Sequence, residues 1–312
     1  MKFAFVFPGQ GSQSVGMLNS WQDQPDVQRL LSRANNALGS DLSGLIAQGP
    51  IESLNLTTNT QPAMLVAGLA AHVAWVAAGG PAPALMAGHS LGEYAALTAA
   101  GSLKLEDAVR LVRIRADAMQ AAVPVGTGAM AAILGLDDEA VKVACESAAE
   151  GQVVEAVNFN APNQVVIAGH EAAVERAMVQ AKAAGAKRAI RLPVSAPFHS
   201  SLIKPAADAL AQALAQVDVG ACAVPVIHNV DVQIHASADD IRVALVSQAW
   251  HAVQWVRTIQ AMRAAGITHI VECGPGKVLA GLVKRIDPEL TGLSVADPES
   301  LQQALDTLAS SS

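Results

Sequence analysis

A serine between two glycines is the first feature with chemical content. Gly88-His89-Ser90-Leu91-Gly92 follows an apolar run at 84–87 and precedes an alanine-rich stretch. Gly-x-Ser-x-Gly in this setting predicts a strained turn from a strand into a helix, which lifts the serine hydroxyl clear of the backbone. The Leu91 amide would then lie at a helix N-terminus and could stabilise a developing oxyanion. The pattern indicates nucleophilic attack on an acyl carbon.

A histidine from elsewhere in the chain must activate this serine, because a serine hydroxyl is a weak nucleophile at neutral pH. Among the eight histidines, His199 is the best candidate, since Ala196-Pro197-Phe198-His199-Ser200 lies at a boundary between two predicted units. Clefts form at such boundaries. Spacing alone leaves the assignment open. His89 is expected to be structural, because neighbouring side chains at a turn point in different directions.

Two glycine-rich loops lack the spacing of phosphate-binding motifs. Phe7-Pro8-Gly9-Gln10-Gly11-Ser12-Gln13 follows the first predicted strand, but Ser14 stands where a dinucleotide-binding loop has its third glycine. Gly274-Pro275-Gly276-Lys277 is not followed by the Ser or Thr of a phosphate loop. In a parallel sheet both loops would present backbone N–H groups beside Ser90. Gln10 is therefore a candidate second oxyanion donor.

Arg115 combines a positive charge with a predicted position near an apolar helix face. Over residues 105–122 it groups at helical spacing with Ala108 and Leu111. A partly buried guanidinium requires an anion, and its planar fork could hold a carboxylate through two parallel hydrogen bonds. From spacing alone, an ion pair within the protein explains Arg115 equally well.

The composition restricts the remaining function classes. The 312 residues are 52% hydrophobic and 15% charged, with a formal net charge of −7, and no basic stripe suits nucleic acid. Cys145, Cys222 and Cys273 are widely spaced and odd in number, which disfavours a disulfide framework or metal site and favours the cytoplasm. The uncharged run at 63–80 is expected to be a buried helix, not a membrane span.

Apolar periodicity predicts the elements that position these residues. Short apolar runs alternating with helical stretches indicate an α/β, hydrolase-like core with a parallel sheet, whose strands are expected at 2–7, 84–88, 224–229 and 269–273. Residues 128–195 have the ferredoxin-like order βαββαβ, with a last strand over 188–194. This subdomain is expected as an insertion in a large catalytic domain formed by residues 1–127 and 196–312, which ends in a polar, serine-rich tail.

Together these motifs resemble those of the malonyl-CoA:acyl carrier protein transacylases of bacterial fatty acid synthesis. The similarity covers essentially the whole chain. It rests on four motifs, which are the loop at residues 7–13, Gly88-His89-Ser90-Leu91-Gly92-Glu93-Tyr94, Asn158-Phe159-Asn160 and Gly274-Pro275-Gly276-Lys277-Val278-Leu279. An arginine of the family matches Arg115, which favours a substrate carboxylate over an internal ion pair. The family usually has Asn-Pro-Val-x-Trp where this chain has His251-Ala252-Val253-Gln254-Trp255.

The resemblance implies a reaction and a set of roles. Ser90 would take malonyl from malonyl-CoA and pass it to the phosphopantetheine thiol of acyl carrier protein, with His199 as base and then acid. The amides of Gln10 and Leu91 would form the oxyanion hole. The backbone carbonyl of Gln248, rather than an aspartate, would orient His199.

The resemblance also limits cofactors and partners. Asn160 and Phe198 are expected in the substrate pocket. Coenzyme A enters as part of the thioester substrate, so no cofactor or metal is expected, and neither is a nucleic acid or membrane partner. A monomer is expected. An acidic carrier would dock on one of two basic clusters, formed by Lys187, Arg188 and Arg191 or by Lys277, Lys284 and Arg285.

Three other functions stay open at this level. A serine esterase or thioesterase shares Gly-x-Ser-x-Gly, and a carboxylate on His199 would indicate it. A transferase of the same chemistry could serve polyketide synthesis or a malonate decarboxylase. A non-catalytic module that binds the carrier is the third.

Overall fold

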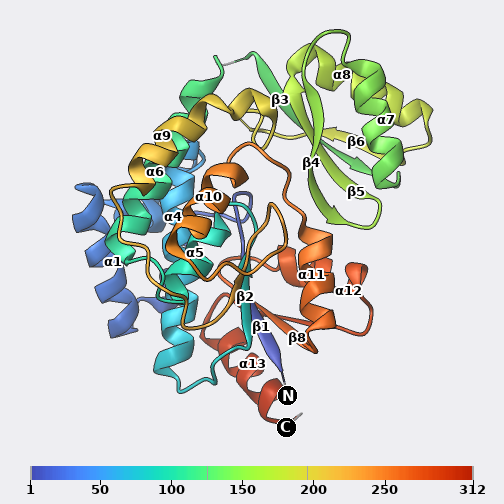
Figure 1. Ribbon diagram of the computed structural model, residues 1–312. Coiled ribbons are helices and arrows are strands. Elements are labelled where there is room, and N and C mark those ends of the chain that lie inside the picture. The colour runs from blue at the N-terminus through green and yellow to red at the C-terminus, as the bar shows by residue number, and fades with distance from the viewer. Residues whose placement is uncertain (1, 125, 195, 311–312) are drawn as a thin grey trace.

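The computed structural model describes residues 2–124, 126–194 and 196–310, which form two parts, each built on its own sheet (Figure 1). The predicted domain boundary at residue 195 lies outside the described residues. At the centre of the larger part, β1 (Phe3–Phe7) turns its three phenylalanines to one layer of helices and Ala4 and Val6 to the other. Burial on both faces is typical of a central parallel strand.

The larger sheet has five parallel strands in the order β7-β2-β1-β8-β9. Their bounds beyond β1 are β2 (Leu85–Gly88), β7 (Val226–Ile227), β8 (His269–Cys273) and β9 (Thr291–Val295). The chain adds β2 and β7 on one side of β1 and then crosses to β8 and β9 on the other. Ligands of α/β sheets bind at such a switch point, outside the carboxyl ends of the strands.

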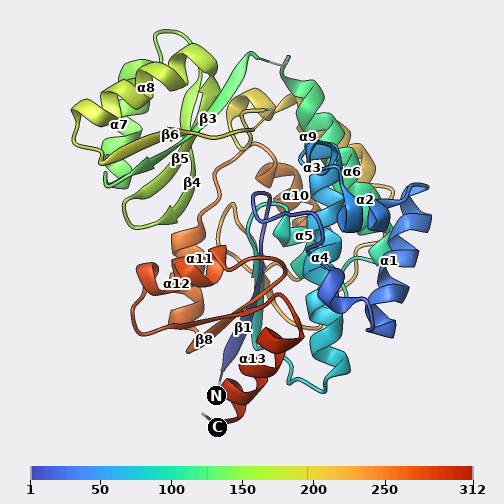
Figure 2. The ribbon, with the colours of Figure 1, turned by 180° about the vertical axis from the view of Figure 1, so that it is seen from behind.

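Helices cover both faces of this sheet (Figure 2). The core on the phenylalanine side includes α1 (Pro25–Leu38), α2 (Leu42–Gln48), α3 (Ile51–Leu54), α4 (Thr57–Ala77), α5 (Gly92–Ala99), α6 (Leu105–Ala122), α9 (Pro205–Leu214), α10 (Ala238–Gln248) and α13 (Pro298–Ser310). The opposite core includes α11 (Trp255–Ala264) and α12 (Val278–Ile286). Two short 3-10 helices complete this part, η1 (Asn19–Trp21) and η2 (Ser201–Ile203).

The long apolar helix α4 lies inside the protein. By length and composition it could cross a membrane, but 78% of its apolar window is buried. It packs against α1, α5 and α6. The helix begins at Thr57 and not at the predicted Ala63, because the Thr60 hydroxyl donates to the carbonyls of Leu54 and Leu56 and stabilises the first turn. This earlier start brings Gln61 into the helix.

The smaller part confirms the predicted ferredoxin-like order. Its elements are β3 (Gly128–Leu134), α7 (Asp138–Ala148), β4 (Val154–Ala161), β5 (Gln164–His170), α8 (Glu171–Ala183) and β6 (Arg188–Arg191). The sheet is antiparallel in the order β4-β5-β3-β6. Strand β6 ends at Arg191 and not at the predicted residue 194, because Pro193 has no N–H to continue the ladder.

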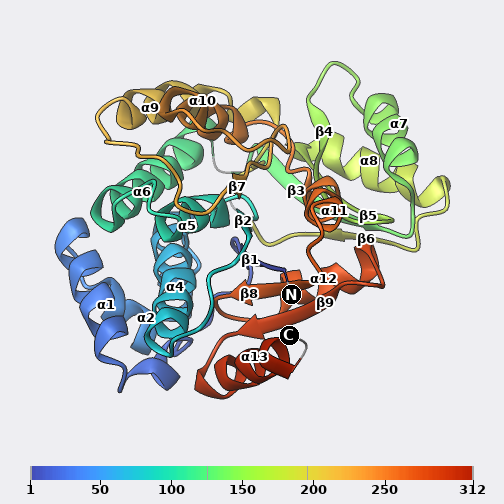
Figure 3. The same ribbon diagram turned by 60° about the horizontal axis from the view of Figure 1, so that its bottom comes forward.

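Three other boundaries differ from the sequence prediction. Strand β7 keeps only Val226–Ile227, because His228 and Asn229 leave the ladder to bond Glu93 on α5. Strand β9 was not predicted. The described chain ends in helix α13, which packs on β9 where a polar tail was expected (Figure 3). Leu301, Ala304 and Leu308 bury one face of this helix, so helical spacing outweighs the serines.

The turn that carries Ser90 is held by contact between backbones. A Cβ on Gly92 would lie 2.0 Å from the Phe7 carbonyl oxygen, and one on Gly88 would lie 1.8 Å from the Gly92 carbonyl carbon. Neither position admits a side chain unless the backbone moves. Ser90 itself has φ of 53°, in the left-handed region. Because residues 88 and 92 are glycines, the turn around Ser90, which we call the elbow, packs directly against the end of β1. This packing holds Ser90 in its strained left-handed conformation.

Gly92→Ala should lower the free energy of unfolding by about 3 kcal/mol, because a methyl group must displace the backbone of β1. Urea unfolding followed by tryptophan fluorescence measures this. Gly281→Ala is the matched control in α12, where a Cβ would meet nothing within 4 Å, and it should stabilise by about 0.5–1 kcal/mol. Equal stabilities for Gly92→Ala and the wild type would contradict the tight elbow contact.

Candidate active site

The structure brings Ser90 and His199 into direct contact. Ser90 lies between β2 and α5, and its Oγ is 2.6 Å from Nε2 of His199. His199 precedes η2 and, like Ser90, has a positive φ, of 65°. Strained backbone at two facing residues persists only where the surroundings over-determine it. The contact is within reach for proton transfer between the hydroxyl and the imidazole.

Two backbone carbonyls orient the His199 ring. Nδ1 lies 2.9 Å from the oxygen of Gln248 and 3.2 Å from that of His251. Because both are acceptors, Nδ1 carries the proton and Nε2 offers a lone pair to Ser90. Within the described part of the chain, no carboxylate bonds His199. The site is therefore a Ser-His dyad without the acidic third member that an esterase triad has.

Burial is the main reason that His199 stays neutral. Burial, with a further contribution from the charge of Arg115, lowers the pKa of His199 to about 3. The imidazole is 4% exposed. At neutral pH it is therefore unprotonated and able to accept the serine proton.

Arg115 lies beside Ser90 and is held by neutral side chains. Its Nη2 donates to Ser90 Oγ at 3.1 Å and to Gln248 Oε1 at 3.0 Å, and Nη1 donates to Gln61 Oε1 at 2.8 Å. The side chain is 2% exposed, and its Nε has no hydrogen-bond partner. Among the described residues no carboxylate forms an ion pair with it. The internal ion pair that spacing left open for Arg115 therefore has no acidic partner in the described chain.

The two predicted oxyanion donors lie on neighbouring loops. Leu91 is buried at the N-terminus of α5, and Gln10 follows β1 with an exposed side chain. In the residues that the structure describes, neither backbone amide donates to a protein acceptor. Both are available to a ligand oxygen.

One cavity of about 190 Å³ lies where the two parts of the protein meet. Its polar lining consists of Gln10, His89, Ser90, Arg115, Asn158, Asn160 and His199, and its apolar lining of Met130, Val166, Leu192, Val194 and Phe198. Asn160 and Phe198 both line this cavity, and their role in a substrate pocket stays a prediction. His89, expected to be structural, bonds Asn160 through Nε2 at 2.7 Å. A larger groove of about 950 Å³ shares Gln10, Leu192 and Val194 with the cavity.

The segment from His251 to Trp255 joins the two parts behind the base. Val253 exchanges backbone hydrogen bonds with β4, donating to Val157 at 2.9 Å and accepting from Phe159 at 3.0 Å. Val253 and Trp255 are fully buried. The chain therefore keeps the valine and tryptophan of the family pattern inside, and the His251-Ala252 departure leaves the His251 carbonyl on His199.

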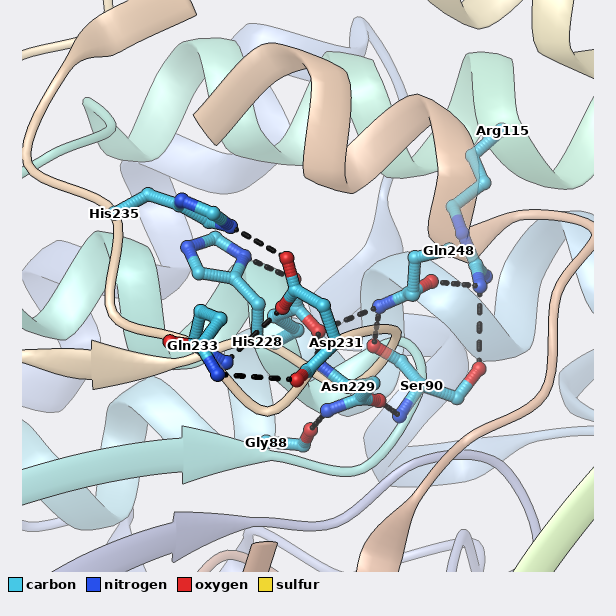
Figure 4. A network of polar contacts seen from close by, with 10 residues as sticks. Gly88, Ser90, Arg115, His228, Asn229, Asp231, Gln233, His235 and Gln248 are labelled. Atoms are coloured by element: carbon cyan, nitrogen blue, oxygen red, sulfur yellow. Dashed lines mark hydrogen bonds and ion pairs between the residues drawn. The ribbon is translucent and has the colours of Figure 1, made fainter. Parts of the chain in front are cut away.

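Sequence reasoning missed the network beneath Ser90 (Figure 4). Asn229 accepts from the Ser90 amide at 2.7 Å and donates to the Gly88 carbonyl at 2.6 Å, so it holds both ends of the elbow. The buried Glu93 carboxylate accepts from His228 Nδ1, the Asn229 amide and Gln248 Nε2 at 2.7, 2.9 and 3.1 Å. An acid three residues after the nucleophile, in an apolar helix, was the available signal for Glu93.

Arg115→Ala should raise the pKa of His199, because a nearby positive charge disfavours the imidazolium. Protonated His199 cannot act as base, so the acid limb of Ser90 acylation should move to higher pH, by about one pH unit. Acylation by uncharged p-nitrophenyl acetate, followed against pH where circular dichroism shows folded protein, measures the midpoint. Arg110→Ala, on the solvated face of α6, is the control. An unmoved midpoint in Arg115→Ala would refute this coupling.

Comparison with known proteins shows a family match over most of the chain. Residues 4–286 match the family model for an acyl transferase domain. A malonyl CoA-acyl carrier protein transacylase of Escherichia coli strain K12 is 56% identical over 306 residues, covering 98% of this chain and 99% of the relative. One of Bacillus subtilis strain 168 is 46% identical over 98% of this chain and 97% of its own.

Solved structures share the whole fold. An acyl-carrier-protein S-malonyltransferase from Burkholderia pseudomallei superposes with a TM-score of 0.97 at 59% identity, over 98% of this chain and all of its own. A malonyl-transacylase in complex with a type II PKS acyl-carrier protein also gives 0.97, at 51% identity over 98% of this chain and 100% of that one. The chain belongs to the acyl transferase family, among the malonyl CoA-acyl carrier protein transacylases.

Proposed function

We propose that the protein transfers malonyl from malonyl-CoA to the phosphopantetheine thiol of acyl carrier protein through a malonyl ester of Ser90, for fatty acid synthesis. The observation that carries this proposal is Arg115, a buried cation without a carboxylate partner in the described chain, bonded to the nucleophile at 3.1 Å. Malonyl supplies the missing carboxylate on the far side of its thioester carbonyl. The printed names of the relatives support the same reaction.

The first half of the reaction follows from the contacts of the dyad. Ser90 Oγ attacks the thioester carbon while its proton passes to His199 Nε2, 2.6 Å away. The amides of Gln10 and Leu91 would receive the oxyanion, and losing one such donor costs about 3 kcal/mol of transition-state stabilisation. Collapse breaks the carbon–sulfur bond, and His199 returns the proton to the departing thiolate of coenzyme A.

The second half repeats these steps with the carrier thiol as nucleophile. His199 takes the thiol proton, the sulfur attacks the ester carbon, and Ser90 leaves with the proton restored. The cavity of about 190 Å³ suits a short acyl group, and its mouth meets the groove of about 950 Å³. We assign that groove to the pantetheine arm of either thiol substrate. Transfer needs no metal or bound cofactor in this scheme.

The compartment follows from thiol chemistry. The three cysteines are free, and burial raises the pKa of the Cys145 thiol to about 12 and that of Cys273 well above its usual range. Such thiols are unreactive. They support assignment to the reducing cytoplasm, and the expectation of a monomer stays a prediction.

Intact-protein mass spectrometry after mixing with malonyl-CoA tests the proposal. The wild type should gain one malonyl group and Ser90→Ala none, since only the hydroxyl can form the ester. Adding a phosphopantetheinylated carrier should then remove the adduct faster than water does. Loss of the adduct chiefly to water would indicate a thioesterase, and no adduct on the wild type would refute the catalytic assignment.

The basic cluster at β6 is the better candidate for docking an acidic carrier. Lys187 and Arg188 are exposed and form no ion pair within the described residues, whereas Arg191 pairs with Glu171 and Glu175. This cluster precedes the groove lining at Leu192. Arg285 in the alternative cluster bonds Gln164.

Lys187→Glu with Arg188→Glu should raise the KM for the carrier about tenfold without changing acylation by malonyl-CoA, because steering charges act on the acidic partner alone. Steady-state transfer assays at low salt measure the KM. Lys284→Glu is the control in the other cluster. A rise in the KM for the carrier with Lys284→Glu alone would instead indicate a docking surface on α12.

A further inference from the structure

Among the described residues, the side chains that accept hydrogen bonds from Arg115 are neutral. Gln61 on α4 and Gln248 on α10 each point a carbonyl oxygen at one guanidinium nitrogen, at 2.8 and 3.0 Å. Both glutamines are fully buried. A buried cation is ordinarily paired with an acid, because leaving water is costly for an uncompensated charge. Two amides in place of one carboxylate therefore need an explanation.

The surroundings fix which way each amide points. Gln248 Nε2 donates to Glu93 Oε2 at 3.1 Å and to the Ser90 carbonyl at 2.8 Å (Figure 4). A carboxylate and a carbonyl can only accept, so the NH2 group of Gln248 must face them and its oxygen must face Arg115. Gln61 Nε2 likewise faces the Gln10 side-chain oxygen, at 3.4 Å. Neither amide can turn over without placing two donors or two acceptors together.

Glu93 is thereby kept one amide away from Arg115. The carboxylate accepts from Nε2 of the Gln248 amide, whose Oε1 accepts from Arg115. It also pairs with His228 at 2.7 Å. Direct contact between Glu93 and Arg115 would cancel the charge that a substrate carboxylate needs. The Gln248 amide between them instead orients Arg115 and leaves the guanidinium charge unpaired. The Arg115 Nε still has no hydrogen-bond partner.

We propose that Gln61 and Gln248 are specificity-determining positioning residues, whose side chains form a neutral cradle that fixes Arg115 beside Ser90 without cancelling its charge. The site then favours acyl groups that carry a carboxylate. The inference rests on the proposed transfer of malonyl. Gln248 has a second, separate contact in the site, since its main-chain carbonyl orients His199.

Gln61→Glu is the sharpest test, because it changes charge at constant shape. The new carboxylate would pair with Arg115 directly. No acid in the described chain bonds Gln61, so no neighbouring carboxyl group would hold the new one protonated. We expect kcat/KM for malonyl-CoA to fall on the order of a hundredfold, while acetyl-CoA, which needs no cation, stays within about threefold. Gln61→Met, which removes the acceptor without adding charge, should lower malonyl use about tenfold.

Gln248→Met tests the second arm of the cradle. It keeps the main-chain carbonyl on His199. It also removes the donor to Glu93 and to the Ser90 carbonyl, so kcat/KM should fall for both acyl groups, and about tenfold further for malonyl. Gln152→Met is the matched control, since Gln152 Oε1 accepts from Arg176 at 3.0 Å in the smaller part and has no contact with the site. It should leave both substrates unchanged.

The ratio of malonyl to acetyl kcat/KM decides the matter, with thermal unfolding measured for each variant. A merely structural role would lower both substrates alike, and that result, or an unchanged ratio in Gln61→Glu, overturns the proposal. If Gln61→Glu does not fold, an unchanged ratio in both methionine variants overturns it equally. A wild type without malonyl transfer to the carrier would instead refute the proposed function on which the inference rests.

Discussion

The active site is organised around one buried positive charge next to a serine hydroxyl. Arg115 reaches Ser90 from α6, and α4 and α10 each supply a glutamine to hold it. Three helices and the elbow after β2 must therefore be in register before the guanidinium can be satisfied. No acid among the described residues pairs it directly, so the charge is stabilised by neutral hydrogen-bond acceptors, by the Tyr94 ring and by the more distant charge of Glu93. The free enzyme thus holds an incomplete site whose missing component has the chemistry of the substrate.

The same charge explains why the base has a carbonyl partner where many serine enzymes have an aspartate. A carboxylate bonded to His199 would add a negative charge to the site and would offset part of the Arg115 charge that a substrate carboxylate needs. Backbone carbonyls of Gln248 and His251 fix the tautomer without adding charge. The acidic residue of this network is Glu93, which does not bond His199. It accepts from the Asn229 amide, and the Asn229 side chain in turn accepts from the Ser90 amide. Orientation and charge are thereby supplied by separate residues.

The sequence predicted those parts of the fold that local pattern encodes. The alternating Phe3–Phe7 strand, the glycine elbow and the βαββαβ order all follow from spacing within short segments, and the structure has each of them. Ser90 was identified by its motif, whereas His199 and Arg115 were candidates by residue type whose roles the resemblance then favoured. The positions of Gln10, Asn160 and Phe198 in one cavity agree with expectations from the resemblance.

What sequence could not supply were contacts between distant segments made by residues of ordinary type. Gln61 lies 54 positions from Arg115, and Asn229 lies 139 from Ser90, so no spacing rule joins them. Glutamine and asparagine are common and gain meaning only from their partners. The shortened β7 is the clearest case, since Asn229 ends the strand in order to reach Ser90. Tertiary hydrogen bonds thus overrode the local preference for a longer strand.

The coupling between Arg115 and His199 gives the substrate carboxylate a second consequence beyond binding. The arginine charge helps to depress the pKa of His199, so a carboxylate that offsets this charge would let the pKa rise and make the imidazole a stronger base. An acyl group without a carboxylate leaves the base weak. In the proposed reaction the malonyl carboxylate would stay in place on Ser90 after coenzyme A departs, so His199 would keep the raised basicity for deprotonating the carrier thiol. On the proposed mechanism, the charge of Arg115 would thereby favour malonyl both in binding and in the proton transfers of each half-reaction.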